Sequence, residues 1–145
     1  MSVEDKRYVL DTSALFAFTK GEEGSAFVEE ILNLAKKKKA AVYLSFICLM
    51  ELYYITWQEK GQEAARELII LIQSLPLEKV HSAERLILSA GWIKANYQLS
   101  VADAIIAATA LEKEAILVHK DPEFKALSDK IKMVDLPFKL SGRKS

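Results

Sequence analysis

Short apolar runs alternate with longer amphipathic stretches along the chain, and this alternation is the feature that most restricts its fold. Short apolar runs bounded by turn residues are typical of buried strands, and the longer stretches have the apolar spacing of helices. Strands that alternate with helices form a parallel sheet with helices on both faces. We expect the strands at residues 7–10, 41–44, 77–80, 116–118 and 132–134.

Apolar spacing and terminal signals place the helices between these strands. Ser13 and Ser100 are candidate helix caps, and Gly61 ends the helix that precedes it. The pattern therefore predicts an α/β fold, a three-layer α/β/α domain with a central parallel sheet of about five strands. The expected helices cover residues 14–19, 25–38, 45–60, 62–74, 82–97, 101–112 and 122–127.

Length and charge limit what such a domain can do. The 145 residues are enough for one domain, which we place at 1–140, followed by a polar tail at 141–145. The 20 basic and 20 acidic residues create no net field toward nucleic acid or membrane, so such a contact needs a local patch. Neither a signal-peptide pattern nor an apolar run of ~18 residues is present, which predicts a cytoplasmic protein with no membrane partner. Cys48, the single cysteine, has apolar neighbours and is expected to be an inert buried thiol.

Three carboxylates interrupt apolar stretches, where an unpaired charge costs on the order of several kcal/mol. They are Asp11 in YVLDTSALFAF, Glu51 in ICLMELYYI and Asp103 in LSVADAIIAATAL. Ligands of parallel sheets bind beyond the carboxyl ends of the strands. Asp11 follows the first expected strand, Asp121 follows the fourth, and Asp103 lies near the start of a helix that can face the same edge. Glu51 lies one to two turns into its helix.

Each of these acids, taken alone, also has a structural explanation. Asp11 can form a turn, and Asp121 can cap the short helix that follows it. Asp103 can complete a capping box with Ser100. For Glu51 the structural explanation is a solvated side of its helix, beside Gln58 or Glu59. It is the weakest of the four, because a residue in the middle of a helix caps nothing and its neighbours one turn away are mostly apolar.

Taken together, the four carboxylates indicate a cation site. Carboxylates that converge repel one another, and their pKa values rise unless a cation is present. Ligand sets made only of oxygen favour Mg²⁺ or Mn²⁺ over Zn²⁺. Such an ion suits phosphodiester hydrolysis, because it polarises the phosphoryl oxygen, activates water and stabilises the leaving oxygen.

The order of these motifs resembles the PIN domain, a Mg²⁺- or Mn²⁺-dependent ribonuclease fold best known in VapC-type toxins of toxin–antitoxin pairs. The likeness covers nearly the whole chain and is carried by VLDTSAL, the helical glutamate, LSVADAIIAATAL and ILVHKDPEF. It implies that Asp11, Glu51 and Asp103 are metal ligands and that Asp121 is the more variable fourth acid. Ser13 then corresponds to a hydroxyl residue that holds the first carboxylate or a metal-bound water.

The chain departs from the family pattern at His119, where many members have Thr or Ser. We expect His119 to be a packed or exposed residue outside the catalytic set. Lys120 is the base best placed to meet a phosphate near the metal, whereas the lysines at 36–39 are expected to be a solvated helix end.

Two consecutive helices carry more apolar side chains than a core requires. Tyr53, Tyr54 and Trp57 lie on the Glu51 helix, and residues 69–72 make the next helix apolar on all sides. This excess indicates a further buried surface, either a homodimer interface or a groove for a segment of another protein. The resemblance implies a homodimer whose cognate antitoxin lies across such a groove.

The sequence therefore predicts a metal-dependent endoribonuclease that hydrolyses RNA phosphodiester bonds as the toxin of a type II toxin–antitoxin pair. A PIN-like RNA-processing nuclease and a non-catalytic PIN-like binding scaffold are the alternatives. A phosphatase with Asp11 as its nucleophile is a further enzyme class, but Ser13 stands where the second aspartate of such an enzyme belongs.

Overall fold

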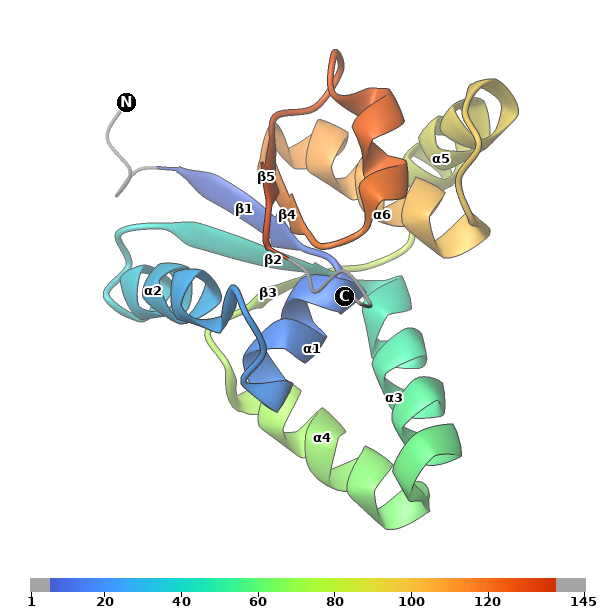
Figure 1. The fold of residues 1–145 in the computed structure, drawn as a ribbon. Coiled ribbons are helices and arrows are strands. Elements are labelled where there is room, and N and C mark those ends of the chain that lie inside the picture. The colour runs from blue at the N-terminus through green and yellow to red at the C-terminus, as the bar shows by residue number, and fades with distance from the viewer. Residues whose placement is uncertain (1–5, 138–145) are drawn as a thin grey trace.

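The computed structural model describes residues 6–137 and is built around a five-stranded sheet (Figure 1). All strand pairs are parallel, and the strand order is β3-β2-β1-β4-β5. The central strand is β1, in which Val9 lies opposite Tyr43 on one side and Leu117 on the other. The strands are β1 (Arg7–Leu10), β2 (Ala41–Ser45), β3 (Glu78–Val80), β4 (Ile116–His119) and β5 (Met133–Asp135).

Helices cover both faces of this sheet. The chain moves from β1 toward one edge through β2 and β3, and then crosses to β4 and β5 at the other edge. Because crossovers between parallel strands are right-handed, the first four helices lie on one face and the later ones on the other, as Figure 1 shows. This arrangement confirms the expected three-layer α/β/α class. The helices are α1 (Thr12–Lys20), α2 (Ser25–Lys36), α3 (Phe46–Lys60), α4 (Gln62–Ser74), α5 (Glu84–Asn96), α6 (Val101–Lys113) and the 3₁₀ helix η2 (Pro122–Leu127).

The observed element boundaries lie close to the expected ones, and the start of α1 shows why some shift. The Asp11 carboxylate accepts a hydrogen bond from Ala14 N and caps the helix, so the prediction that Ser13 is the cap is wrong. The cap predicted for α6 is confirmed, because Ser100 Oγ accepts a hydrogen bond from Asp103 N.

α6 is the helix that fixes the sheet against its outer layer. Its residues from Ala104 to Ala110 are all buried, and it contacts β1, β2 and β4 on one side and α5 on the other. The alanines in this run keep the helix close to the strands. Because α6 is held so firmly, its first turn, which carries Asp103, has a defined place beside the sheet.

The predicted domain end at residue 140 and the polar tail at 141–145 lie outside the described residues. Between residues 6 and 137, no helix has both the length and the apolar character needed to cross a bilayer.

Candidate functional site

The carboxyl ends of the two central strands carry the first and the fourth predicted acids. Asp11 directly follows β1, is only 2% exposed and caps α1 through the 2.8 Å hydrogen bond from Ala14 N. Asp121 follows β4 and caps η2, where its Oδ1 accepts a hydrogen bond from Glu123 N at 2.9 Å. The local capping role expected for Asp121 is therefore confirmed.

Ser13 joins these two strand ends. Its hydroxyl lies 2.8 and 2.9 Å from the two carboxylate oxygens of Asp11, to which it donates. The same oxygen accepts a hydrogen bond from Lys120 N at 2.9 Å. Ser13 therefore orients the Asp11 carboxylate and ties it to the loop that carries Asp121.

Glu51 reaches the same region from α3. Its Oε1 accepts a 2.6 Å hydrogen bond from the Thr12 hydroxyl, although the two residues are far apart in sequence. Glu51 is half-buried, which agrees with its position on a largely apolar helix face. The sequence analysis did not identify Thr12 as a site residue, and the only signal for it was its place in the Asp-Thr-Ser motif.

Asp103 completes the group from the first turn of α6. Since Ser100 caps this helix with its own hydroxyl, the Asp103 side chain is not needed as a cap. Asp103, Asp121 and Glu123 each place a carboxylate oxygen within 4.8 Å of the others. Glu123 was missed by the sequence analysis, and its signal is its position two residues after Asp121 in a short 3₁₀ helix. Together with Asp11 and Glu51, these three residues are called the acidic cluster below.

Burial and the charges of neighbouring acids raise the pKa values of two members of the acidic cluster, Asp11 and Asp103. Burial is the largest cause that raises the pKa of Asp11 to about 7; hydrogen bonds from Ala14 and Ser13 oppose it, and the charges of Asp121 and Glu51 add to it. The pKa of Asp103 is also raised to about 7, first by burial and then by Asp121, with Asp11 and Glu51 adding to the shift. The structure therefore brings all four predicted acids into electrostatic contact, although Asp11 and Glu51 lie outside the tight group of three.

His119 is fully buried beneath the fourth acid. Its Nδ1 accepts a hydrogen bond from Asp121 N at 3.1 Å, so the proton of a neutral ring lies on Nε2. Nε2 lies 2.9 Å from Asp135 Oδ1 in β5 but is not aligned for a hydrogen bond with it. Burial, the largest influence, lowers the pKa of His119. The expectation of a packed residue is met, and the imidazole also holds the backbone of Asp121.

The ammonium group of Lys120 is already paired with oxygens of residues outside the acidic cluster. Its Nζ lies 3.3 Å from Glu22 Oε1 and 3.2 Å from the Glu23 carbonyl oxygen, both in the connection between α1 and α2. The predicted contact between Lys120 and a phosphate therefore competes with an existing ion pair.

Cys48 lies under the cluster without the surroundings of a nucleophile. It is fully buried, its Sγ is 3.9 Å from the Leu10 carbonyl oxygen, and burial raises the pKa of its thiol further above the usual range. The prediction of an inert thiol agrees with this environment.

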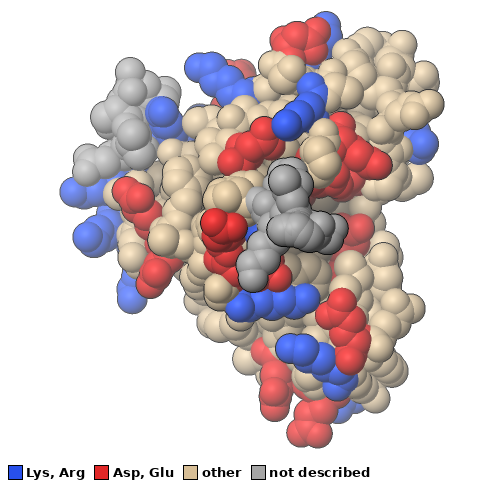
Figure 2. Space-filling view, viewed as in Figure 1, with Lys and Arg blue, Asp and Glu red and all other residues tan. Residues whose placement is uncertain are grey.

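The surface has no dominant sign of charge on the side drawn in Figure 2, where acidic and basic side chains are interspersed.

Comparisons with known proteins agree on one family and one fold. The family model of the PIN domain matches residues 8–130. The structure of DNA-bound VapBC from Salmonella typhimurium superposes with a TM-score of 0.72 at 23% identity, covering 90% of this chain and 98% of that chain. VapBC2 from Rickettsia felis bound to a DNA fragment from its promoter gives 0.71 at 22% identity, with 90% and 99% covered.

A third solved structure is VapC20 from Mycobacterium tuberculosis, described as a Sarcin-Ricin loop cleaving toxin. It superposes with a TM-score of 0.64 at 20% identity, covering 82% of this chain and 93% of that chain. At sequence identities of 20%, 22% and 23%, the structural similarity shows that this chain has the same fold as these three proteins. A comparison with curated proteins found no significant match.

Proposed function

The chain belongs to the PIN domain family, and from this premise we propose that it is a Mg²⁺- or Mn²⁺-dependent endoribonuclease, the toxin of a type II toxin–antitoxin pair. The observation that carries the proposal is the acidic cluster, in which Asp11 and Asp103 come from different elements and both have pKa values raised to about 7. Carboxyl groups with raised pKa values in a cleft indicate a functional site. The proposed place of action is the cytoplasm.

The donor set of the acidic cluster fits a hard divalent cation. All of its side chains offer carboxylate oxygens, and Asp103, Asp121 and Glu123 already bring theirs within 4.8 Å of one another. Mg²⁺ and Mn²⁺ prefer such oxygen ligands, and a cation offsets the repulsion that adds to the raised pKa values of Asp11 and Asp103. We propose that Asp11, Glu51, Asp103 and Asp121 hold the ion, with Glu123 beside Asp121.

The residues of the chain prepare this site before substrate arrives. A bound divalent cation supplies Lewis-acid polarisation of the scissile phosphate and offsets the charge that develops on its oxygens. The Ser13 hydroxyl and Ala14 N–H donate to Asp11, which favours its ionised form and fixes its direction. The Thr12 hydroxyl donates to one oxygen of Glu51 and fixes the direction of that carboxylate. Because these donors already hold the carboxylates of Asp11 and Glu51 in place, those side chains need little rearrangement when a phosphodiester binds.

An antitoxin and a second copy of the chain are the proposed protein partners. Support comes from apolar side chains that remain exposed on α3 and α4, among them Met50, Trp57 and Ile70. A cavity of about 470 Å³ lies between these helices and is lined almost wholly by apolar groups. The Salmonella and Rickettsia relatives in fold are VapBC complexes, which supports an antitoxin as the partner proposed for this surface.

Substitution of single carboxylates tests the nuclease proposal. We expect Asp11→Asn and Asp103→Asn each to abolish Mn²⁺-dependent cleavage of single-stranded RNA, because each removes one ionised ligand while keeping the side-chain volume. Cleavage is measured on a labelled RNA by gel electrophoresis, and circular dichroism checks the fold. Asp129→Asn is the matched control, because Asp129 is exposed and lies outside the acidic cluster. Wild-type cleavage rates in both site variants would refute the assignment.

A further inference from the structure

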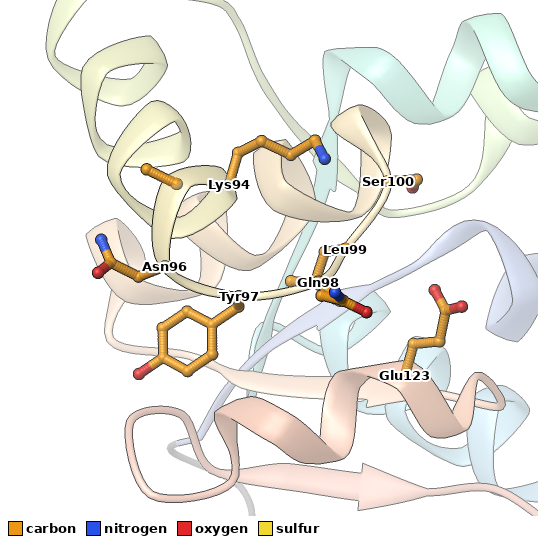
Figure 3. Close-up of a pocket in the computed structure, with 8 residues that line it drawn as sticks. Lys94, Asn96, Tyr97, Gln98, Leu99, Ser100 and Glu123 are labelled. Carbon is orange, nitrogen blue, oxygen red and sulfur yellow. The ribbon is translucent and has the colours of Figure 1, made fainter.

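The connection between α5 and α6 forms a groove that adjoins the acidic cluster. The groove has a volume of about 650 Å³ and is lined by residues 94–100 together with Glu123 of η2. Figure 3 shows Asn96 and Tyr97 at one end of it and Ser100 and Glu123 at the other. Glu123 also belongs to the acidic cluster, so the groove adjoins the candidate metal site. Its volume falls in the range of about 300–1,000 Å³ that is usual for small-molecule sites.

We propose that this groove binds one nucleotide of single-stranded RNA next to the phosphate that is cleaved, with Tyr97 as the platform on which the base stacks. The inference rests on the proposed ribonuclease function and assigns it a substrate-binding site. The acidic end of the groove faces the reacting phosphate, and the aromatic end lies farther away, where a neighbouring base would be placed.

The aromatic end has the properties of a stacking platform. Tyr97 is half-buried, and its ring centroid lies 6.1 Å from that of Trp92 at a tilt of 58°. The contact with Trp92 supports the tyrosine ring, and the lining of the groove leaves part of that ring accessible. Aromatic rings that are held in this way bind unpaired bases by stacking, and they accept any base because each has a π-face.

The polar side chains of the groove match the other parts of a nucleotide. Lys94 and Gln98 are exposed and make no side-chain hydrogen bond or ion pair with any residue in the described part of the chain. Figure 3 shows the Lys94 side chain extending in the direction of Ser100, toward the acidic end of the groove. An ammonium there can neutralise a backbone phosphate, and the Gln98 amide can pair with the edge of a base.

The lining distinguishes this groove from the apolar cavity between α3 and α4. That cavity is lined mainly by leucine, methionine and isoleucine side chains, together with Tyr53 and Arg66, and its accessible surface is almost wholly apolar, which suits a protein segment. The groove beside Glu123 instead presents an ammonium, amides and a hydroxyl around one aromatic ring. Single-stranded RNA is favoured over a duplex, because bases must be unstacked to meet an aromatic side chain.

The test measures RNA binding separately from cleavage. A fluorescein-labelled single-stranded RNA of ~10 nucleotides is titrated with the full chain in EDTA, and its Kd is read by anisotropy at several salt concentrations. We expect Tyr97→Ala to raise Kd by roughly fivefold to hundredfold, as loss of one stacked base predicts. Tyr97→Phe keeps the ring and should stay within about twofold of wild type.

Lys94→Ala provides a second variant that does not depend on core packing. It should weaken binding and reduce the slope of log K against log salt by about 0.7, the value for one phosphate contact on a single strand. Lys130→Ala is its matched control, because Lys130 is an exposed lysine outside the groove. Melting temperatures of all variants show whether any loss of binding reflects unfolding.

The outcomes separate this inference from the proposed function. Cleavage and RNA binding by the wild type, with unchanged Kd in folded Tyr97→Ala and Lys94→Ala, would overturn the groove and leave the nuclease proposal standing. A wild type that neither binds nor cleaves RNA in Mn²⁺ overturns both.

Discussion

At the scale of single residues, three consecutive residues, Asp11, Thr12 and Ser13, each contribute a different contact to the candidate site. Asp11 supplies a buried carboxylate, Ser13 fixes it, and Thr12 holds a carboxylate that comes from another helix. The junction between β1 and α1 therefore both ends the strand and orients two carboxylates of the acidic cluster. Because Asp11 is both a helix cap and a buried acid, its surroundings stabilise the ionised form locally while burial opposes it.

The raised pKa values predict how stability depends on pH and metal. The pKa of Asp11 and of Asp103 is about 7 in the folded protein against 3.8 ordinarily, so the folded state binds more protons between these values. Their contribution to the free energy of unfolding is therefore present below about pH 4 and is lost as the pH rises through about 7. In EDTA, we expect the melting temperature to fall between about pH 5 and about pH 8, measured by differential scanning calorimetry.

Manganese should reverse this loss most strongly where the carboxylates are ionised. The rise in melting temperature on adding Mn²⁺ should be larger at about pH 8 than at about pH 6, because protons and metal compete for the same oxygens. Asp103→Asn serves as the control and should reduce both the pH effect and the Mn²⁺ effect. An equal or larger Mn²⁺ effect at the lower pH would contradict the link between pKa and metal.

At the scale of elements, the site depends on helices that are held by contacts distant in sequence. α6 is buried along most of its length, and Gly24, the residue that precedes α2, lies against Leu136 in the segment that follows β5. Gly24 has φ +94, and a Cβ there would lie 3.0 Å from Leu136 Cβ. The start of α2 thus needs glycine both for its backbone conformation and for space.

A pair of glycine substitutions tests this account. Gly24→Ala should destabilise the protein by more than about 1 kcal/mol, because the new methyl group meets Leu136 and the backbone is left-handed. Gly91→Ala, in the exposed part of α5 where nothing lies within 4 Å, should stabilise it by roughly 0.5–1 kcal/mol. Chemical denaturation measures both changes. Equal free energies of unfolding for the two variants would show that neither the contact with Leu136 nor the left-handed backbone at Gly24 affects stability.

At the scale of the whole molecule, two separate surfaces expose large apolar side chains. One lies on α3 and α4 and includes Ile70, which is 68% exposed; the other lies on α5 and includes Leu88, which is 67% exposed. The equal balance of acidic and basic residues gives no net repulsion between copies of the chain. The proposed homodimer therefore has to be assigned to one of two apolar faces.

Matched charge substitutions assign the interface. We expect the wild type to sediment as a dimer and Ile70→Glu as a monomer, because a carboxylate in a packed apolar interface is left without a partner. Leu88→Glu, which changes an equally exposed leucine on the other surface, should remain dimeric in analytical ultracentrifugation. Dissociation by Leu88→Glu alone would place the interface on α5, and a monomeric wild type would exclude the homodimer.

The parts of this protein that follow from local sequence were predictable. The alternation of strands and helices predicted the parallel sheet, and the ends of those strands located Asp11 and Asp121 at one edge. Hydrophobic periodicity and capping are local, so they can be read from neighbouring residues. The grouping of Asp103 with them followed from the same rule, because its helix starts near that edge.

Only the tertiary structure decided which side chains meet. This is true of the hydrogen bond between Thr12 and Glu51, of the place of Glu123 beside Asp103, and of the ion pair between Lys120 and Glu22. Each contact joins segments that are not adjacent in the sequence. The pattern of residues along the chain does not specify how far apart such segments lie in space. Their approach is set by how the helices pack on the sheet, and that packing determines which charges share a cleft and which are already paired.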